Sequence, residues 1–360
     1  MGPLNRTYII AEAGVNHNGS VELAVELIDA AVEAGADAVK FQTFKPELLV
    51  SAFAGKADYQ KKLTDSEESQ LDMLRKLQLP EESYPKLLER CRARGIHFLS
   101  TPFDLDSLSL LTETYDIPTI KLPSGEITNP LLLYRTARTG KPIILSTGMS
   151  TLGEIETALS VIAFGYVAAD EKPSRDKILR AYASEAGQRA LRDNVTLLHC
   201  TTEYPAPLDE VNLNVMDTLK RAFNLKVGYS DHTQGIAIPV AAAAKGAAVI
   251  EKHFTLDRGM PGPDHQASLE PMELKQMVSA IRDVEKALGN PIKHPTASEI
   301  NNKLVVRKSL VAIRAIRKGE PFSEENLAIK RPGTGRSPME YWEMLGQPAD
   351  RDYERDEPVQ

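Results

Sequence analysis

The stretch Val227-Gly-Tyr-Ser-Asp-His232, followed by Val249-Ile-Glu-Lys-His253-Phe254, decides the fold. Both runs are short and contain β-branched or aromatic residues, which favours strands. Between them lies an alanine-rich amphipathic segment, residues 235–246, so the order is strand, helix, strand, and a parallel pair is predicted. Such a pair would bring His232 and His253 to one edge of the sheet, the edge that carries the chemistry in α/β folds.

The same alternation of strand and helix patterns runs from residue 8 to residue 288. The strand candidates are residues 8–13, 38–43, 97–101, 119–124, 142–148, 195–202, 226–232 and 249–254. Eight such units are typical of the (β/α)8 TIM barrel, and no GxGxxG fingerprint favours a doubly wound sheet. We therefore predict an α/β protein with a TIM-barrel catalytic domain over residues 1–288.

A smaller unit follows the predicted barrel. Residues 289–303 are polar and contain prolines, which indicates a linker, and residues 304–360 form a second domain. This domain has short strand-like runs at 309–313 and 327–330, many turns and little helix, so we expect it to be mostly β. It is too small to be catalytic alone.

Two connections in the predicted barrel are long. Residues 44–80 follow the second strand, so we expect them on the active face, as a lid or a partner contact. The charged residues 166–194 precede the sixth strand, and we expect them mostly on the opposite face without a catalytic role.

The composition excludes several classes of protein. The formal net charge of −7 has no strong run of either sign, which gives no support for nucleic-acid or membrane-surface binding. No apolar run is long enough to span a bilayer and no signal peptide is recognisable, so we expect a cytoplasmic protein. The two cysteines, Cys91 and Cys200, are predicted to be buried reduced thiols.

Strand alternation predicts which side chains face the barrel interior. When the apolar residues near each strand end are placed toward the helices, a mostly polar set remains inside. This set is Glu12, Lys40, Gln42, Thr101, Lys121, Ser146, Thr202, Ser230, His232 and His253. A layer that only packs would consist of Val, Ile and Leu instead. One residue, Lys252, is directed toward the helices and would need a partner there or have to reach solvent.

The inward set suits two kinds of ligand. Lys40 and Lys121, with serine hydroxyls on neighbouring strands, suit a phosphate or carboxylate. Two neutral imidazoles, His232 and His253, near the carboxylate of Asp264 suit a divalent transition metal with positions open to substrate and water. A single histidine is more often a hydrogen-bonded core residue, and the pairing at adjacent strand ends is what favours a metal.

These residues lie in motifs that resemble the bacterial sialic acid synthase family, including its N,N'-diacetyllegionaminate synthase branch. The matching stretches are Tyr8-Ile-Ile-Ala-Glu-Ala-Gly-Val-Asn-His-Asn-Gly19, Val39-Lys-Phe-Gln-Thr-Phe44, Ser100-Thr-Pro-Phe103, Lys121-Leu-Pro-Ser-Gly-Glu126, Ile144-Leu-Ser-Thr-Gly-Met149, Tyr229-Ser-Asp-His-Thr233 and Glu251-Lys-His-Phe-Thr255. At the C-terminus, Lys308-Ser-Leu-Val-Ala312 and Lys330-Arg-Pro-Gly-Thr-Gly335 are similar to the antifreeze-like SAF domain of that family.

The resemblance implies condensation of phosphoenolpyruvate with an N-acetylated hexosamine of the N-acetylmannosamine type, giving a nonulosonic acid and phosphate. It implies catalytic roles for Glu12, Lys40, Lys121, Glu126 and Asp264. It implies substrate contacts for Gln42, Thr101, Ser124, Ser146, Thr202, Tyr204, Ser230 and Arg331. His232 and His253 would hold a divalent metal, Mn²⁺ first, with Mg²⁺ or Co²⁺ as alternatives. Which carboxylate is the general base stays open.

The family also implies a domain-swapped homodimer, in which Arg331 of one protomer reaches the sugar in the barrel of the other. Two features point to the legionaminate branch, whose substrate is 2,4-diacetamido-2,4,6-trideoxymannose. They are the stretches Phe41-Gln-Thr-Phe-Lys45 and Gly262-Pro-Asp-His-Gln-Ala-Ser-Leu-Glu-Pro271, which have the form of that branch. Separately, Thr202 stands where sialic acid synthases have an asparagine beside the phosphate, and its hydroxyl is left at that place. The sugar therefore stays open between these two.

Other functions explain the residues less well. A metal-dependent amidohydrolase would need His-x-His on the first strand, where this chain has Glu12. A non-enzymatic sugar-binding or ice-binding protein would leave the inward lysines and the histidine pair unexplained. Synthases that use a sugar phosphate would need a further arginine-rich site, which we do not find.

Overall fold

The computed structural model describes residues 6–51, 53–56, 64, 68–168 and 171–360. The chain divides into two compact units, residues 1–289 and residues 290–360. Each unit has its own hydrophobic core, and each is described here by itself.

The first unit is a barrel of eight parallel strands, as predicted. The strands are β1 (Tyr8–Gly14), β2 (Ala38–Thr43), β3 (His97–Pro102), β4 (Ile120–Leu122), β5 (Ile143–Ser146), β6 (Val195–His199), β7 (Lys226–Asp231) and β8 (Val249–His253). Their order is β3-β2-β1-β8-β7-β6-β5-β4, and β3 and β4 also lie side by side, which closes the sheet. Every strand lies within the range predicted from the sequence or extends it by one residue.

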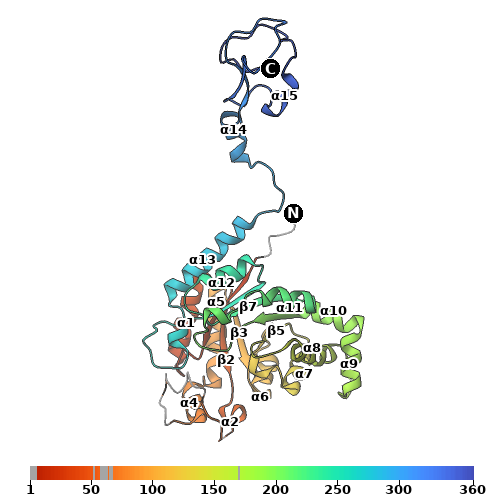
Figure 1. The fold of residues 1–360 in the computed structure, drawn as a ribbon. Helices are drawn as coiled ribbons and strands as arrows, with labels where there is room; N and C mark the ends of the chain where they lie inside the picture. The colour runs from red at the N-terminus through yellow and green to blue at the C-terminus, as the bar shows by residue number, and fades with distance from the viewer. Residues whose placement is uncertain (1–5, 52, 57–63, 65–67, 169–170) are drawn as a thin grey trace. The chain divides into compact units, whose positions relative to one another are not determined.

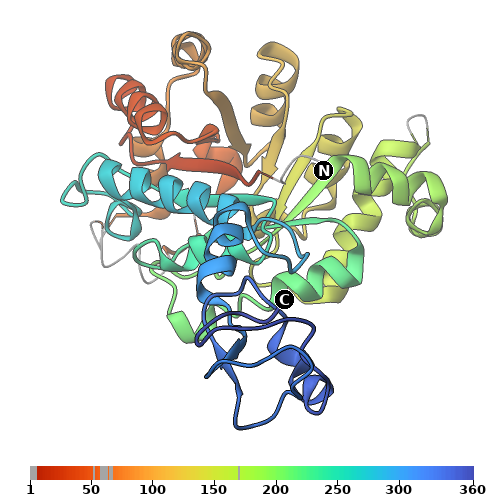
Figure 2. The ribbon, with the colours of Figure 1, turned by 90° about the horizontal axis from the view of Figure 1, so that it is seen from above.

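Helices surround these strands (Figures 1 and 2). They are α1 (Val21–Ala34), α5 (Tyr84–Arg94), α6 (Leu105–Ser109), α7 (Pro130–Arg138), α8 (Leu152–Val167), α11 (Val215–Phe223), α12 (Ala237–Ala244) and α13 (Pro271–Leu288). Short helical turns are η1 (Glu81–Ser83), η2 (Leu110–Thr114), η3 (Ser124–Glu126), η4 (Leu208–Glu210) and η5 (His265–Ala267). The Ser20 hydroxyl caps α1, and a capping box of Thr151 and Glu154 begins α8.

Two hydrophobic layers hold the barrel together. The larger one lies between the strands and the helices. The smaller one fills the barrel interior and is called the apolar plug below. Its residues are Ile10, Ala38, Leu99, Ile144, Leu198 and Val249. Gly228 of β7 lies beside them, and a Cβ there would clash with Leu198 and the Val249 carbonyl, so the packing requires glycine.

The two long connections both contain helices. The first forms α2 (Pro46–Leu49) and α4 (Gln70–Leu77) at the end of the barrel where β2 ends (Figure 1). Residues 52, 57–63 and 65–67 of this connection lie outside the described residues, and its role as a lid or partner contact stays a prediction. The second forms α9 (Arg175–Ala183) and α10 (Glu185–Asn194), which pack against α8.

The second unit begins differently from the prediction. Part of the expected linker, residues 289–303, is helical, because Thr296 and Glu299 form a capping box that begins α14 (Ala297–Val306). An antiparallel pair, β9 (Ser309–Ala312) and β10 (Leu327–Lys330), then packs with α15 (Tyr341–Met344) around a small core. The turn η6 (Pro338–Glu340) directly precedes α15. In neither unit do the described residues form a helix long and apolar enough to cross a membrane.

Candidate active site

A cavity of about 310 Å³ lies at the carboxyl ends of the barrel strands. It brings together most of the residues expected from the sequence. Its lining includes Glu12, Lys40, Gln42, Thr101, Lys121, Ser124, Ser146, Thr202, Tyr204, Ser230, His232, His253 and Asp264. The side chains come from different strands and the loops that follow them, so the barrel itself positions the site.

Two expected residues are not among those that line the cavity. Glu126 lies in η3, where its carboxylate accepts a hydrogen bond from Asn129 at 2.7 Å beside the start of α7. Arg331 belongs to the second unit, where its Nε donates to the Val306 carbonyl at 3.0 Å. Its contact with the sugar in another protomer stays a prediction.

The polar floor of the cavity is a cluster of two lysines and two carboxylates. Lys40 Nζ lies 2.6 Å from Glu12 Oε2 and 3.6 Å from Glu251 Oε2. Lys121 Nζ lies 3.4 Å from Glu251 Oε1. None of the four residues is more than 4% exposed. Each buried cation is therefore neutralised by a carboxylate that also holds it in place.

Glu251 is the member of this cluster that sequence reasoning missed. It accepts a hydrogen bond from Ser230 Oγ at 2.8 Å and faces both lysines. The signal was available, since the alternation that turns His253 inward also turns Glu251 inward, two residues earlier on β8.

The four charges shift one another's protonation. Burial raises the pKa of Glu12 to about 7, although Lys40 opposes this. Burial also disfavours ionisation of Glu251, but Lys121 and Lys40 outweigh it and lower the pKa of Glu251 to about 2. The two lysines thus favour the ionised form of Glu251, while burial favours the protonated form of Glu12.

The two histidines lie side by side with their ring centroids 5.7 Å apart. His232 Nδ1 donates to the Thr201 carbonyl at 2.5 Å, which leaves Nε2 with a lone pair, 3.2 Å from the Tyr204 hydroxyl. His253 Nδ1 is buried without a hydrogen-bond partner and lies 3.8 Å from Asp264 Oδ2. Burial lowers the pKa of both histidines, so both are neutral and can act as ligands.

This donor set fits a divalent metal. The Thr201 carbonyl orients His232 in the way that backbone groups orient metal-bound imidazoles. The Nδ1 atom of His253 has no hydrogen-bond partner, so its lone pair is available to a metal. Among the described residues no group of three His, Cys, Asp or Glu is assembled to hold a metal. Substrate or water would therefore complete the coordination of an ion held by the two imidazoles.

Lys252 has the partner that its outward direction required. The side chain is fully buried, and its Nζ donates to Asp231 Oδ2 at 2.6 Å and to the Thr233 carbonyl. The ion pair of Lys252 and Asp231 links β8 to β7. Lys252 directly precedes His253 in the sequence, and Asp231 directly precedes His232. Cys91 and Cys200 are both free and buried, as predicted.

One side of the cavity is apolar, which the sequence did not predict. We call this side the apolar wall. Its residues are Leu49, Val50, Met73, Leu74 and Leu77, from α2, α4 and the residue after α2. The wall belongs to the connection that follows β2, so that connection contributes directly to the site.

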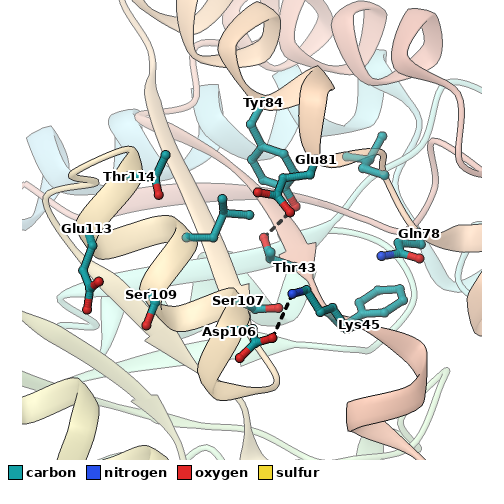
Figure 3. Close-up of a pocket in the computed structure, with 13 residues that line it drawn as sticks. Thr43, Lys45, Gln78, Glu81, Tyr84, Asp106, Ser107, Ser109, Glu113 and Thr114 are labelled. Carbon is teal, nitrogen blue, oxygen red and sulfur yellow. Dashed lines mark hydrogen bonds and ion pairs between the residues drawn. The ribbon is translucent and has the colours of Figure 1, made fainter.

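A second cavity, of about 300 Å³, lies between the end of β2 and α6 (Figure 3). Lys45 lines it, and its Nζ pairs with Asp106 at 2.8 Å. Glu81 and Glu113 also line it, and none of the expected site residues does. An acidic lining of this kind does not suit a phosphate or carboxylate.

Comparisons with known proteins agree with this geometry. A family model described as NeuB family matches residues 27–293, and a SAF domain model matches residues 307–360. The chain is 52% identical to the N,N'-diacetyllegionaminic acid synthase of Campylobacter jejuni, over 98% of this chain and 99% of that one. It is 44% identical to the protein of the same name from Legionella pneumophila, over 94% of this chain and 89% of that one.

A solved structure is also similar. The N-acetylneuraminic acid (sialic acid) synthetase of Leptospira borgpetersenii, in complex with citrate, superposes with a TM-score of 0.65 at 32% identity. The match covers 84% of this chain and 93% of that chain.

Proposed function

Because this chain belongs to the NeuB family, we propose that it condenses phosphoenolpyruvate with an N-acetylated amino sugar to give a nonulosonic acid and phosphate. The observation that carries the proposal is the cavity itself, where two buried lysines and several hydroxyls lie beside two neutral histidines. The names of the relatives, synthases of legionaminic and sialic acids, support the same reaction.

Phosphoenolpyruvate would bind on the polar floor. Lys40 and Lys121 provide two ammonium groups, and Ser124, Ser146 and Ser230 provide hydroxyl donors around them. Together these suit an anion with a phosphate at one end and a carboxylate at the other. Glu12 and Glu251 hold the lysines in position before the substrate arrives, which reduces the reorganisation needed on binding.

We propose that His232 and His253 hold a divalent metal, Mn²⁺ first, with Mg²⁺ or Co²⁺ as alternatives. When bound, the ion supplies a Lewis acid for the aldehyde oxygen of the open-chain sugar. His232 is fixed by the Thr201 carbonyl, and Tyr204 packs against it with ring centroids 4.2 Å apart. Gln42 and Thr202 line the same cavity and can bond sugar hydroxyls.

Proton transfer falls to two carboxylates. The pKa of Glu12 is raised to about 7, and burial raises the pKa of Asp264 to about 6, with Lys40 opposing. Either group can therefore hold or release a proton near neutral pH, which suits general acid–base catalysis. Asp264 lies on the metal side, next to His253, and Glu12 lies on the lysine side.

For the sugar we weigh two candidates. N-acetylmannosamine would make the chain a sialic acid synthase. The two relatives named N,N'-diacetyllegionaminic acid synthase, at 52% and 44% identity, favour 2,4-diacetamido-2,4,6-trideoxymannose instead.

We also propose a domain-swapped homodimer in the cytoplasm. Arg331 is exposed in the second unit, which supports its predicted role as a contact from one protomer to the sugar in the other.

The test is phosphate release from phosphoenolpyruvate with Mn²⁺ present, using each sugar in turn and no sugar as the control. We expect release that depends on both sugar and metal. Silence with both sugars, from protein that is folded and loaded with metal, would contradict the condensation. Preference for either sugar would decide between the two synthase assignments.

A further inference from the structure

The cavity has two chemically different sides. On one side lie the charged floor and the serine hydroxyls described above, and on the other lies the apolar wall. The floor suits phosphoenolpyruvate. The wall has no hydrogen-bonding side chain among its five members, and a ligand made only of anions and hydroxyls would leave it unmatched.

The wall is a packed surface and not a set of isolated side chains. Met73 and Leu77 are buried in a small core with Val15 and Phe44, and Leu49 and Leu74 pack against this core. Phe44 meets Phe103, another lining residue of the cavity, edge to face at 6.2 Å. Such packing fixes the position of the apolar surface before any ligand binds.

Further contacts hold α4 in place. Arg75 pairs with Glu47 of α2 at 2.9 Å, and the Ser69 hydroxyl accepts from the Asp72 amide to cap the helix. Gly19, in the turn after β1, packs so closely on the Lys76 carbonyl that a Cβ would clash there. The wall is therefore tied to the barrel from the side of β1 as well as from β2.

The reaction decides which part of the sugar meets the wall. The new carbon–carbon bond joins the enol carbon of phosphoenolpyruvate to the aldehyde carbon, so these two atoms must be in contact near the floor. The opposite end of the sugar then lies away from the floor, and the apolar wall is among the lining residues that remain to meet it. A hydroxyl on that end would lose its hydrogen bonds to water without replacing them, whereas a methyl group would be well placed.

We propose that the apolar wall selects amino sugars that carry methyl and acetamido groups, in place of hydroxyls, at the end distant from the aldehyde. Gln70, at the start of α4, also lines the cavity, and its amide can bond the oxygen of such an acetamido group. The inference rests on the proposed function and adds the residues that choose the sugar. Selection by an apolar surface is limited, so we expect a preference of about 10-fold to 200-fold.

The experiment compares kcat/KM for three sugars at saturating phosphoenolpyruvate and Mn²⁺. They are 2,4-diacetamido-2,4,6-trideoxymannose, N-acetylmannosamine, and N-acetylmannosamine without its 6-hydroxyl, which isolates the methyl group. Leu49→Gln and Leu74→Gln place an amide in the wall at two half-buried positions. Leu48→Gln is the matched control, since Leu48 lies next to Leu49 on α2 but is 56% exposed and does not line the cavity. Thermal unfolding shows which variants are folded.

We expect the unmodified protein to prefer the two deoxy sugars. Leu49→Gln and Leu74→Gln should each reduce that preference about 10-fold through KM for the sugar, with KM for phosphoenolpyruvate unchanged, and Leu48→Gln should retain it. Equal use of all three sugars, or an undiminished preference in both folded wall variants, would overturn the inference alone. No turnover with any sugar would remove the proposed function and the inference with it.

Discussion

The barrel interior contains two layers of side chains. Their residues lie two positions apart along the same strands, so both sets point inward. On β1 the plug residue Ile10 precedes Glu12, on β2 Ala38 precedes Lys40, and on β8 Val249 precedes Glu251. The two layers are thus about 7 Å apart along each strand. The lower layer is apolar and packs, whereas the upper layer buries four ionisable groups that would be costly without their partners.

One backbone pattern in this barrel supports both a packed layer and a charged layer. The apolar plug fills the barrel below the site, so the charged layer lies on a closely packed apolar surface. The charged layer brings ionisable groups to the cavity, and they can be buried there because the two lysines and two carboxylates pair with one another. Substitutions in the two layers should therefore affect different measurements.

The largest expected effect comes from the charged layer. Lys40→Met removes the cation between Glu12 and Glu251, and we expect turnover to fall about 10³-fold because a preorganised charge at the proposed phosphoenolpyruvate site is lost. The fold should persist, since burial already holds the pKa of Glu12 near 7 and the carboxyl can take up a proton. Phosphate release and thermal unfolding measure the two effects. Turnover within 10-fold of that of the unmodified protein would contradict the proposed role of Lys40 in the reaction.

The next largest effect concerns the buried ion pair of Lys252 and Asp231, which lies outside the barrel interior. Lys252→Met leaves Asp231 buried without its cation, and we expect the free energy of unfolding to fall by about 3–5 kcal/mol. The double variant Asp231→Asn, Lys252→Met should recover much of this loss, because the uncompensated charge is gone. Urea unfolding measures both. A single variant as stable as the unmodified protein would mean that the pair contributes nothing to the joint between β7 and β8.

The smallest of the three effects belongs to the apolar plug. Leu198→Ala opens a cavity in the barrel interior, and we expect the free energy of unfolding to fall by about 2–5 kcal/mol. At temperatures where the variant is folded, kcat and both KM values should stay close to those of the unmodified protein. Urea unfolding and steady-state kinetics check the two statements. A large fall in kcat with unchanged stability would reverse the assignment of the layers.

Much of the site was predictable because strand alternation is a local property. The same rule that placed Lys40, Lys121, Ser230 and His253 inside would also have placed Glu251 there. Glu126 was expected from the family resemblance, and its catalytic role stays a prediction. It follows Ser124 by two residues in the turn η3, where its carboxylate accepts a hydrogen bond from Asn129.

Composition also did not predict the helix α14, which begins within the expected linker. Residues 289–303 are polar and contain Pro291 and Pro295, which indicated a linker. The capping box of Thr296 and Glu299 begins a helix directly after Pro295. Capping residues can start a helix in a segment whose composition alone predicts none.

The sequence by itself determined the barrel, the order of its strands and the inward lysines and histidines. Hydrophobic periodicity and strand ends are local properties, which neighbouring residues in the chain decide. Only the tertiary structure decided three further features. It paired Lys252 with Asp231 across two strands, it set Glu251 between two lysines, and it brought α2 and α4 to the cavity as the apolar wall. These features depend on distances between segments far apart in the chain, and packing in three dimensions, not local pattern, sets those distances.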